Sequence, residues 1–179
     1  GWKISYWPVD SEGLIRLELI DKFLTESTKL VSITWAQSEI GTTQPVIKIA
    51  EECRRRNIIF HTDATQILPH GLLNWKQYPI DLLTASAHKL MGPKGIGLLM
   101  QSSNVYSKIG SIQGGGKQEN FLRSGTEPLA LIAGFVKAVD LIDNKLVIEN
   151  GFPVFPDNKV KKITHKLLSK LRSCSLLKF

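Results

Sequence analysis

The stretch LLTASAHKLMGPKGIG, residues 82–97, decides the fold of this chain. Its apolar and small residues are typical of a buried strand, which we expect over residues 80–87. Ser86, His88 and Lys89 come where that strand ends, and glycines and a proline then turn the chain into another apolar run. The pattern therefore places a lysine amine at the end of a buried strand, beside a turn.

Short apolar runs alternate with helical patterns on both sides of this stretch. The strands are expected at residues 29–35, 58–63, 80–87 and 95–100. The helices are expected at residues 14–28, 44–57, 126–146 and from 158 onward. Strands that alternate with helices are typical of an α/β fold, and continuous apolar strands indicate burial on both faces. We therefore predict a mostly parallel sheet flanked by helices.

Polar side chains follow three of the predicted strands. In open α/β sheets, ligands bind beyond the carboxyl ends of the strands. The residues there are Gln37, Ser38 and Glu39, then His61, Asp63 and Gln66, and then Ser86, His88 and Lys89. A purely structural sheet does not need three such clusters, so the sequence predicts a binding site at this edge.

Two of these residues have both an ordinary and a catalytic interpretation. Lys89 is either a solvated loop lysine or an amine that has lost hydration and serves as a Schiff-base nucleophile. Asp63 is either a helix cap or a charge partner for a buried cation. The pyridinium nitrogen of pyridoxal 5'-phosphate (PLP) is a cation that requires such a carboxylate.

The neighbouring polar residues have similar alternatives. Gln66 is either a surface residue or a hydrogen-bond donor to the PLP ring hydroxyl. Ser86 and His88 either form a hydrogen-bonded turn, with His88 as a core histidine, or face a phosphate ester together with the lysine. The segment QGGGKQENFLRSGTE, residues 113–127, leads into a helix that Thr126 is expected to cap, and a helix start after glycines can bind an anion.

Four segments, in order, resemble the cysteine desulfurase family, the NifS/IscS-like enzymes of the class V aminotransferase fold. They are VSITWAQSEIGTTQPV (31–46), IIFHTDATQ (58–66), PIDLLTASAHKLMGPKGIGLLM (79–100) and GGGKQENFLRSGTEPLALIAGF (114–135). The resemblance covers roughly residues 1–145. It implies the large domain of the PLP-dependent transferases, which is aspartate aminotransferase-like, and a chain that is incomplete at both ends.

The resemblance also implies a role for each site residue. Lys89 matches the catalytic lysine that forms the Schiff base with PLP, and Asp63 matches the partner of the pyridine nitrogen. Gln66 matches the residue that bonds the ring hydroxyl, and Ser86 and His88 match phosphate contacts.

Further matches concern the cofactor and a second subunit. Thr126 matches a threonine that reaches the cofactor phosphate of the partner subunit, which implies a homodimer. Gln37 stands where the family usually has an asparagine near the cofactor, and Lys117 stands where the family usually has a glycine.

The implied activity takes sulfur from L-cysteine, leaving alanine and a persulfide for iron–sulfur cluster assembly or another sulfur-transfer pathway. The implied partner is a sulfur-acceptor or scaffold protein. The persulfide cysteine and the arginine for the substrate carboxylate have no match in this chain, and Cys174 is not assigned to the former role. Two alternatives stay open: a related PLP-dependent lyase acting on the C–S bond of cystine or the C–Se bond of selenocysteine, or a truncated, non-catalytic desulfurase-like domain.

Composition limits the remaining possibilities. The chain has 179 residues, a net charge of +7 and two cysteines, Cys53 and Cys174. Two cysteines form no disulfide framework, so we expect a cytoplasmic protein. The basic residues lie on predicted helix surfaces without a nucleic-acid motif, no run is long enough to span a bilayer, and no metal-ligand spacing is present. We expect no nucleic-acid, membrane or metal binding.

The expected domain organisation has three parts. Residues 1–146 form the central part of the PLP-binding large domain. Residues 147–157, rich in proline and aromatic residues, form a linker. Residues 158–179 begin a C-terminal small domain.

Overall fold

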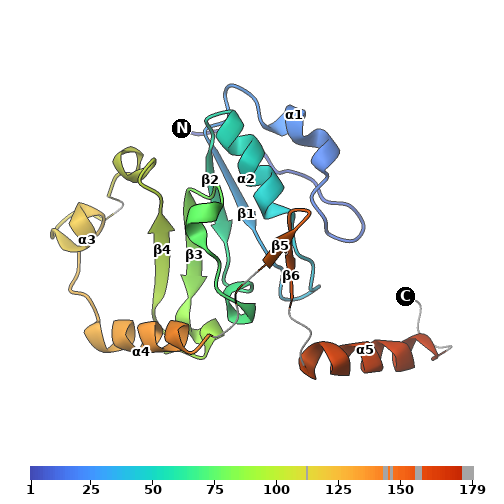
Figure 1. The fold of residues 1–179 in the computed structure, drawn as a ribbon. Coiled ribbons are helices and arrows are strands. Elements are labelled where there is room, and N and C mark those ends of the chain that lie inside the picture. Colours follow the sequence, from blue (N-terminus) through green and yellow to red (C-terminus); the bar gives the residue numbers. More distant parts are fainter. Residues whose placement is uncertain (112, 143–144, 146, 156–158, 175–179) are drawn as a thin grey trace.

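A computed structural model of the chain describes residues 1–111, 113–142, 145, 147–155 and 159–174. Its centre is a four-stranded sheet (Figure 1). The strands are β1 (Leu30–Thr34), β2 (Ile59–Asp63), β3 (Leu82–Ser86) and β4 (Gly97–Gln101), in the spatial order β1-β2-β3-β4. β1, β2 and β3 are parallel, whereas β4 runs antiparallel to β3. The prediction of a mostly parallel sheet flanked by helices is confirmed.

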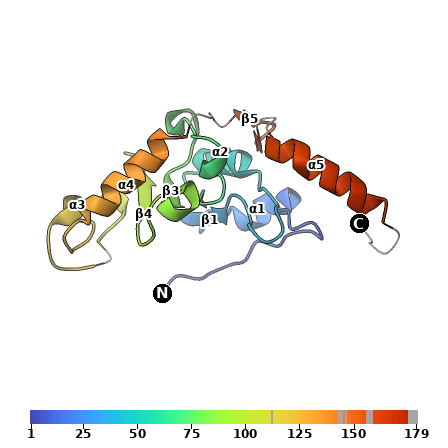
Figure 2. The same cartoon turned by 90° about the horizontal axis from the view of Figure 1, so that it is seen from below.

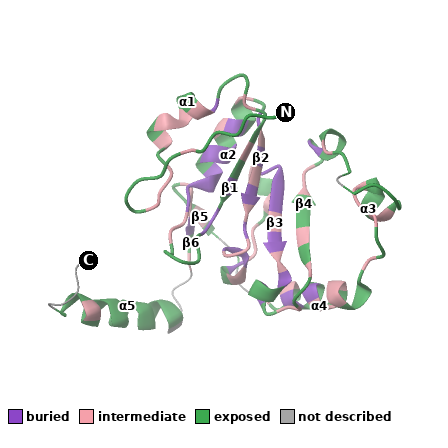
Figure 3. Cartoon of the chain, turned by 180° about the vertical axis from the view of Figure 1, so that it is seen from behind, coloured by how far each residue is buried: buried purple, intermediate pink, exposed green. Residues whose placement is uncertain are grey.

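One face of the sheet is covered and the other is open. The helix α2 (Val46–Arg55) lies over β1 and β2 (Figure 1) and buries Val46, Ile49 and Cys53. Figure 3 shows the strands from the side away from α2. On that open face, Leu30 and Leu99 are more than half exposed. The alternation of side chains along each strand therefore separates a core face from a partly solvated face.

The turn after β3 explains why β4 reverses direction. Met91 (φ 61°) and Gly95 (φ 88°) both have left-handed backbone conformations, which bend the chain back within a short connection. A parallel strand would instead need a long crossover. At Gly97, an added Cβ would lie 2.8 Å from the Ala85 carbonyl oxygen, so only glycine permits this close approach of β4 to β3.

The helix α4 (Leu129–Asp140) packs against the end of the sheet through small residues. An added Cβ at Gly92 would lie 3.2 Å from the Ala138 Cβ, and one at Gly134 would lie 3.1 Å from the ring of Pro93. The helix begins after Pro128, and no side chain caps it, so the predicted cap at Thr126 is wrong. The helix also ends before the predicted residue 146, and residues 143, 144 and 146 lie outside the described ones.

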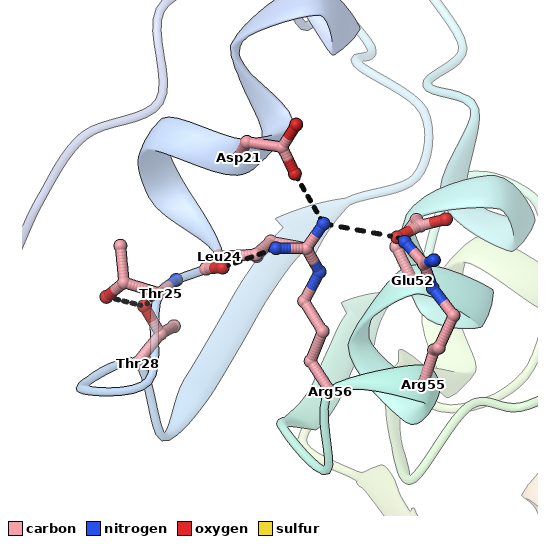
Figure 4. A network of polar contacts seen from close by, with 7 residues as sticks. All are labelled: Asp21, Leu24, Thr25, Thr28, Glu52, Arg55 and Arg56. Carbon is pink, nitrogen blue, oxygen red and sulfur yellow. Dashed lines mark hydrogen bonds and ion pairs between the residues drawn. The ribbon is translucent and has the colours of Figure 1, made fainter.

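The predicted helix at 14–28 forms only in part, as η1 (Leu17–Leu19) and α1 (Ile20–Phe23). Thr28 Oγ1 donates to the Phe23 carbonyl at 2.7 Å, so a turn replaces further helix. Figure 4 shows how Arg56, just after α2, connects α2 to the α1 segment. It donates to the Leu24 carbonyl at 2.8 Å and pairs with Asp21 of α1. The same guanidinium lies 3.5 Å from Glu52 of α2, and these contacts raise the pKa of Arg56.

The C-terminal part contains a hairpin and a projecting helix. The hairpin consists of β5 (Val147–Glu149) and β6 (Phe152–Val154), which lie within the predicted linker. Beyond it, the Phe155 ring contacts the His70 ring at 5.0 Å. The helix α5 (Lys159–Arg172) points away from the sheet (Figure 2). The predicted division into domains stays a prediction.

The remaining elements are short. They are η2 (Leu68–His70), η3 (Trp75–Gln77), η4 (Ala87–Leu90), η5 (Tyr106–Lys108) and α3 (Gln118–Phe121). Among the described residues, no helix combines the length and apolar character that crossing a membrane requires.

Candidate functional site at the carboxyl edge of the sheet

The parallel strands bring their carboxyl ends to one edge of the sheet. The register pairs Thr34 with Asp63 and Asp63 with Thr84, so the last residues of β1 and β2 lie beside the end of β3. Ser86 ends β3, and the turn η4 follows directly. The three polar clusters predicted from the sequence therefore begin at the same edge.

Asp63 is bonded through one of its two carboxylate oxygens. Its Oδ1 accepts a hydrogen bond from the Thr65 backbone N–H at 2.9 Å. Its Oδ2 accepts none from the residues that the structure describes, and the side chain is half-buried. This bond closes a turn, and the next helical element, η2, begins only at Leu68, so the interpretation of Asp63 as a helix cap is wrong. Gln66, in the turn that Asp63 opens, is also half-buried.

The turn η4 presents His88 and Lys89 between two buried anchors. Ala87 and Leu90 are buried, whereas His88 and Lys89 are exposed. In a 3-10 turn, residues i and i+3 lie on the same side. Ala87 and Leu90 therefore share the buried side, while His88 and Lys89 between them point elsewhere. The interpretation of His88 as a core histidine is therefore wrong. The expected loss of hydration at Lys89 is not found in this chain either.

The turn after β1 uses Gln37 to hold its own shape. The Gln37 side-chain oxygen accepts from the Glu39 N–H at 3.1 Å, and the Gln37 carbonyl accepts from the Gly41 N–H at 2.9 Å. Ser38 Oγ donates to the Glu39 carboxylate at 2.8 Å. The exposed amide nitrogen of Gln37 is left to face solvent or a ligand.

Thr126 lies in the segment between α3 and α4. The segment with α3 lies on the far side of β4 from β1 and β2 (Figure 1), and Thr126 is exposed. In the same segment, Glu119, Asn120 and Phe121 all have left-handed backbone conformations. Arg123 donates to the Ser124 and Gly125 carbonyls at 3.1 and 3.0 Å. The loop before α4 is thus shaped by its own contacts.

A row of hydrogen bonds crosses the open face, and the sequence analysis did not find it. The Ser32 Oγ lies 2.7 Å from His61 Nδ1, and His61 Nε2 lies 3.2 Å from Thr84 Oγ1. Burial lowers the pKa of His61, although the Asp63 carboxylate opposes that shift. The alternation of polar residues at Ser32 and Thr34 could have indicated this row, because alternate residues of a strand share a face.

The two cysteines differ sharply in environment. Cys53 is buried in α2, and burial raises the pKa of its thiol to about 12. Cys174 is exposed after α5. Because a thiolate is the nucleophilic form, Cys53 is chemically inert at neutral pH. Among the described residues, no group of three or more histidine, cysteine, aspartate or glutamate side chains is arranged to hold a metal ion.

The chain is similar to curated cysteine desulfurases. It is 44% identical over 150 residues to "Cysteine desulfurase IscS" of Clostridium botulinum (strain Kyoto / Type A2), a match that covers 84% of this chain and 37% of that protein. It is 39% identical over 160 residues to "Cysteine desulfurase, mitochondrial" of Drosophila melanogaster, covering 89% of this chain and 35% of the relative. The chain therefore spans a little over one third of the length of these relatives.

Solved structures with the same fold include a NifS-like protein and a complex with cysteine. The "NifS-like protein from Rickettsia africae" superposes with a TM-score of 0.76 at 33% identity, over 93% of this chain and 45% of that one. "SspA in complex with cysteine" superposes with a TM-score of 0.76 at 30% identity, over 95% of this chain and 46% of the other. The resemblance seen in the sequence is confirmed.

The family model described as aminotransferase class-V matches residues 1–179. The match covers every segment described above, including the edge with Asp63 and Lys89. This chain belongs to the aminotransferase class-V family.

Proposed function

We propose that this chain is the cofactor-binding part of a PLP-dependent cysteine desulfurase. The observation that carries the proposal is the half-buried Asp63, whose Oδ2 has no hydrogen bond from the described residues, at the edge where η4 holds Lys89. Because Asp63 Oδ2 is not among the buried atoms that lack a partner, it is reachable by solvent and therefore by a ligand.

The residues at this edge fit PLP in their chemistry. A carboxylate with a free oxygen suits the pyridinium nitrogen, an amine suits the aldehyde, and a hydroxyl with an imidazole suits the phosphate. When bound, PLP supplies an electron sink for bond cleavage at the amino acid. In this assignment Asp63 would accept a hydrogen bond from the protonated ring nitrogen, and Lys89 would supply the amine for the aldehyde.

The other residues orient the cofactor and move protons. Ser86 and His88 would donate to the phosphate, and Gln66 would donate to the ring hydroxyl. Gln37 would offer its amide nitrogen, since its oxygen accepts from the Glu39 N–H within the turn. Lys89 Nζ would also be the group that accepts and returns a proton of the substrate.

Thr126 serves a second subunit in this proposal. It is exposed and lies in the segment beyond β4, away from β1 and β2. In a homodimer, Thr126 would reach the cofactor phosphate of the partner subunit, and its exposure leaves it accessible for that contact.

L-cysteine is the proposed substrate, and alanine and a persulfide are the proposed products. The relatives named cysteine desulfurase and the solved complex of SspA with cysteine support this choice. Cys53 is not the persulfide cysteine, because its thiol is buried and protonated. A sulfur-acceptor or scaffold protein for iron–sulfur cluster assembly is the proposed partner. Both cysteines of the chain are free, which supports a reducing compartment such as the cytoplasm.

A second candidate is a chain that binds PLP without turning over cysteine by itself. The exposure of His88 and Lys89 favours it, because a reactive amine in a working site is shielded from water.

The test is to add PLP to the purified chain and record the absorbance of lysine-bound PLP. We expect a band that is lost in Lys89→Ala and kept in Lys94→Ala, since Lys94 is an exposed lysine of the same turn. Sulfide release from L-cysteine is measured on the same samples. No band in the wild type contradicts both candidates, whereas a band without sulfide supports the second candidate.

A further inference from the structure

His61 is the centre of a polar row that joins three strands. Its Nδ1 lies 2.7 Å from Ser32 Oγ of β1, and its Nε2 lies 3.2 Å from Thr84 Oγ1 of β3. Both ring nitrogens are therefore engaged, one on each side of β2. Backbone hydrogen bonds already hold these strands in register, so a ladder of side chains is not needed for the sheet to form.

The row lies next to Asp63 on the same face of the sheet. His61 and Asp63 are alternate residues of β2, so their side chains emerge on the same face. Thr84 is the register partner of Asp63 in β3 and at the same time bonds His61. Thr84 is thus hydrogen-bonded to His61 and is also the strand neighbour of Asp63 in β3.

The protonation state of His61 suits a supporting role. Burial lowers the pKa of His61 more than the Asp63 carboxylate raises it, so the ring is neutral near neutral pH. A neutral ring donates through one nitrogen and accepts through the other, and each hydroxyl can do either. A neutral His61 can therefore make both hydrogen bonds of the row. Because it carries no charge, it does not compete with a pyridinium nitrogen for the Asp63 carboxylate.

We propose that His61, held by Ser32 and Thr84, is a positioning residue that fixes Asp63 for the pyridine nitrogen of PLP. This inference rests on the proposed function, because it assigns His61 to the same site. His61 acts only through Asp63 and does not touch the cofactor. At metal sites, partners that orient a ligating side chain typically contribute a factor of about ten or more to metal affinity, and we expect an effect of that order here.

A double-mutant cycle on PLP affinity separates positioning from a purely structural role. We expect His61→Leu to weaken PLP binding by about tenfold. In the Asp63→Asn background the same change should have almost no further effect, because the group that His61 positions is already altered. An equal loss in both backgrounds overturns the inference.

Thr84→Val provides a milder variant if His61→Leu fails to fold. It removes the hydroxyl and keeps the shape, and we expect a smaller loss of PLP affinity than with His61→Leu. The matched control is Thr62→Val, because Thr62 lies on the covered face of β2 and its hydroxyl has no hydrogen-bond partner among the described residues. Equal PLP affinities in Thr84→Val and Thr62→Val overturn the inference.

A measurement without cofactor keeps the two proposals distinguishable. NMR titration of the His61 ring in the cofactor-free chain should show that Asp63→Asn lowers the pKa of His61 further, because the carboxylate raises it. An unchanged His61 pKa overturns the positioning role. A wild type that does not bind PLP contradicts the proposed function and its use of His61, whereas wild-type binding without loss in His61→Leu contradicts the inference alone.

Discussion

The two faces of the sheet each carry one aspartate, and the two aspartates are bonded differently. On the side of α2, Asp81 Oδ2 accepts from the Phe60 N–H at 3.0 Å, and Oδ1 accepts from Ser102 Oγ at 3.2 Å. On the open side, among the residues that the structure describes, Asp63 accepts through Oδ1 alone, from the Thr65 N–H. The difference shows that the aspartate on the covered side is satisfied within the fold, whereas the one on the open side keeps an oxygen that solvent can reach.

The strongest test of this comparison is to remove packing from each face. Phe60→Ala removes a fully buried ring and should lower the free energy of unfolding by about 3–5 kcal/mol. Leu99→Ala, on the open face of β4 with 51% of the residue exposed, should change it by no more than about 0.5 kcal/mol. Urea unfolding followed by circular dichroism measures both, and similar losses would contradict a division of labour between the faces.

The two carboxylates provide the next test. Asp81→Ala leaves the buried Phe60 N–H without its partner, so we expect a loss of about 1–3 kcal/mol in the free energy of unfolding. Asp63→Ala should cost less stability and abolish PLP binding. Urea unfolding measures the stability of both variants, and PLP titration measures their affinity for the cofactor. If Asp81→Ala lowers PLP affinity as much as Asp63→Ala, the comparison fails.

The smallest expected effect is a pH dependence of stability from His61. Burial lowers the pKa of His61 below its ordinary value of 6.5, so the unfolded chain binds this proton first as the pH falls. The contribution of His61 is therefore complete above about pH 6.5 and is lost as the pH falls toward the folded pKa. His61→Gln cannot titrate and should show a flatter profile between about pH 7 and pH 5.

The control for this profile is His165→Gln, which changes an exposed histidine of α5. Its stability should follow that of the wild type through the same pH range. If the free energy of unfolding depends on pH in the same way in the wild type and in His61→Gln, the expected contribution of His61 is absent and the prediction is wrong.

Local patterns predicted the strands and α2 well. The expected helix at 44–57 is observed at Val46–Arg55, since its apolar spacing, its proline at the start and its arginines in the last turn all act within one helix. The expected strands begin or end within two residues of β1, β2, β3 and β4. The residues of the site also follow from sequence position, since Asp63 and Ser86 end their strands.

Contacts between distant residues account for what the sequence did not predict. The apolar pattern of 126–146 runs past the end of α4, but Lys145 leaves the helix to form a bridge with Leu72. The row through His61 needs the register of three strands, and no spacing within one strand specifies it. The exposure of Lys89 likewise depends on what packs around η4 and not on the residues of β3.

The sequence by itself determined the α/β class, the order of the strands along the chain, and the identity of the groups at the carboxyl edge. These depend on periodicity and turn chemistry, which act over a few residues. Only the tertiary structure decided that β4 reverses, that one oxygen of Asp63 is left free and that His61 bridges Ser32 and Thr84. Hydrogen bonds and burial depend on which distant residues meet, and that is settled when the strands pack into one sheet.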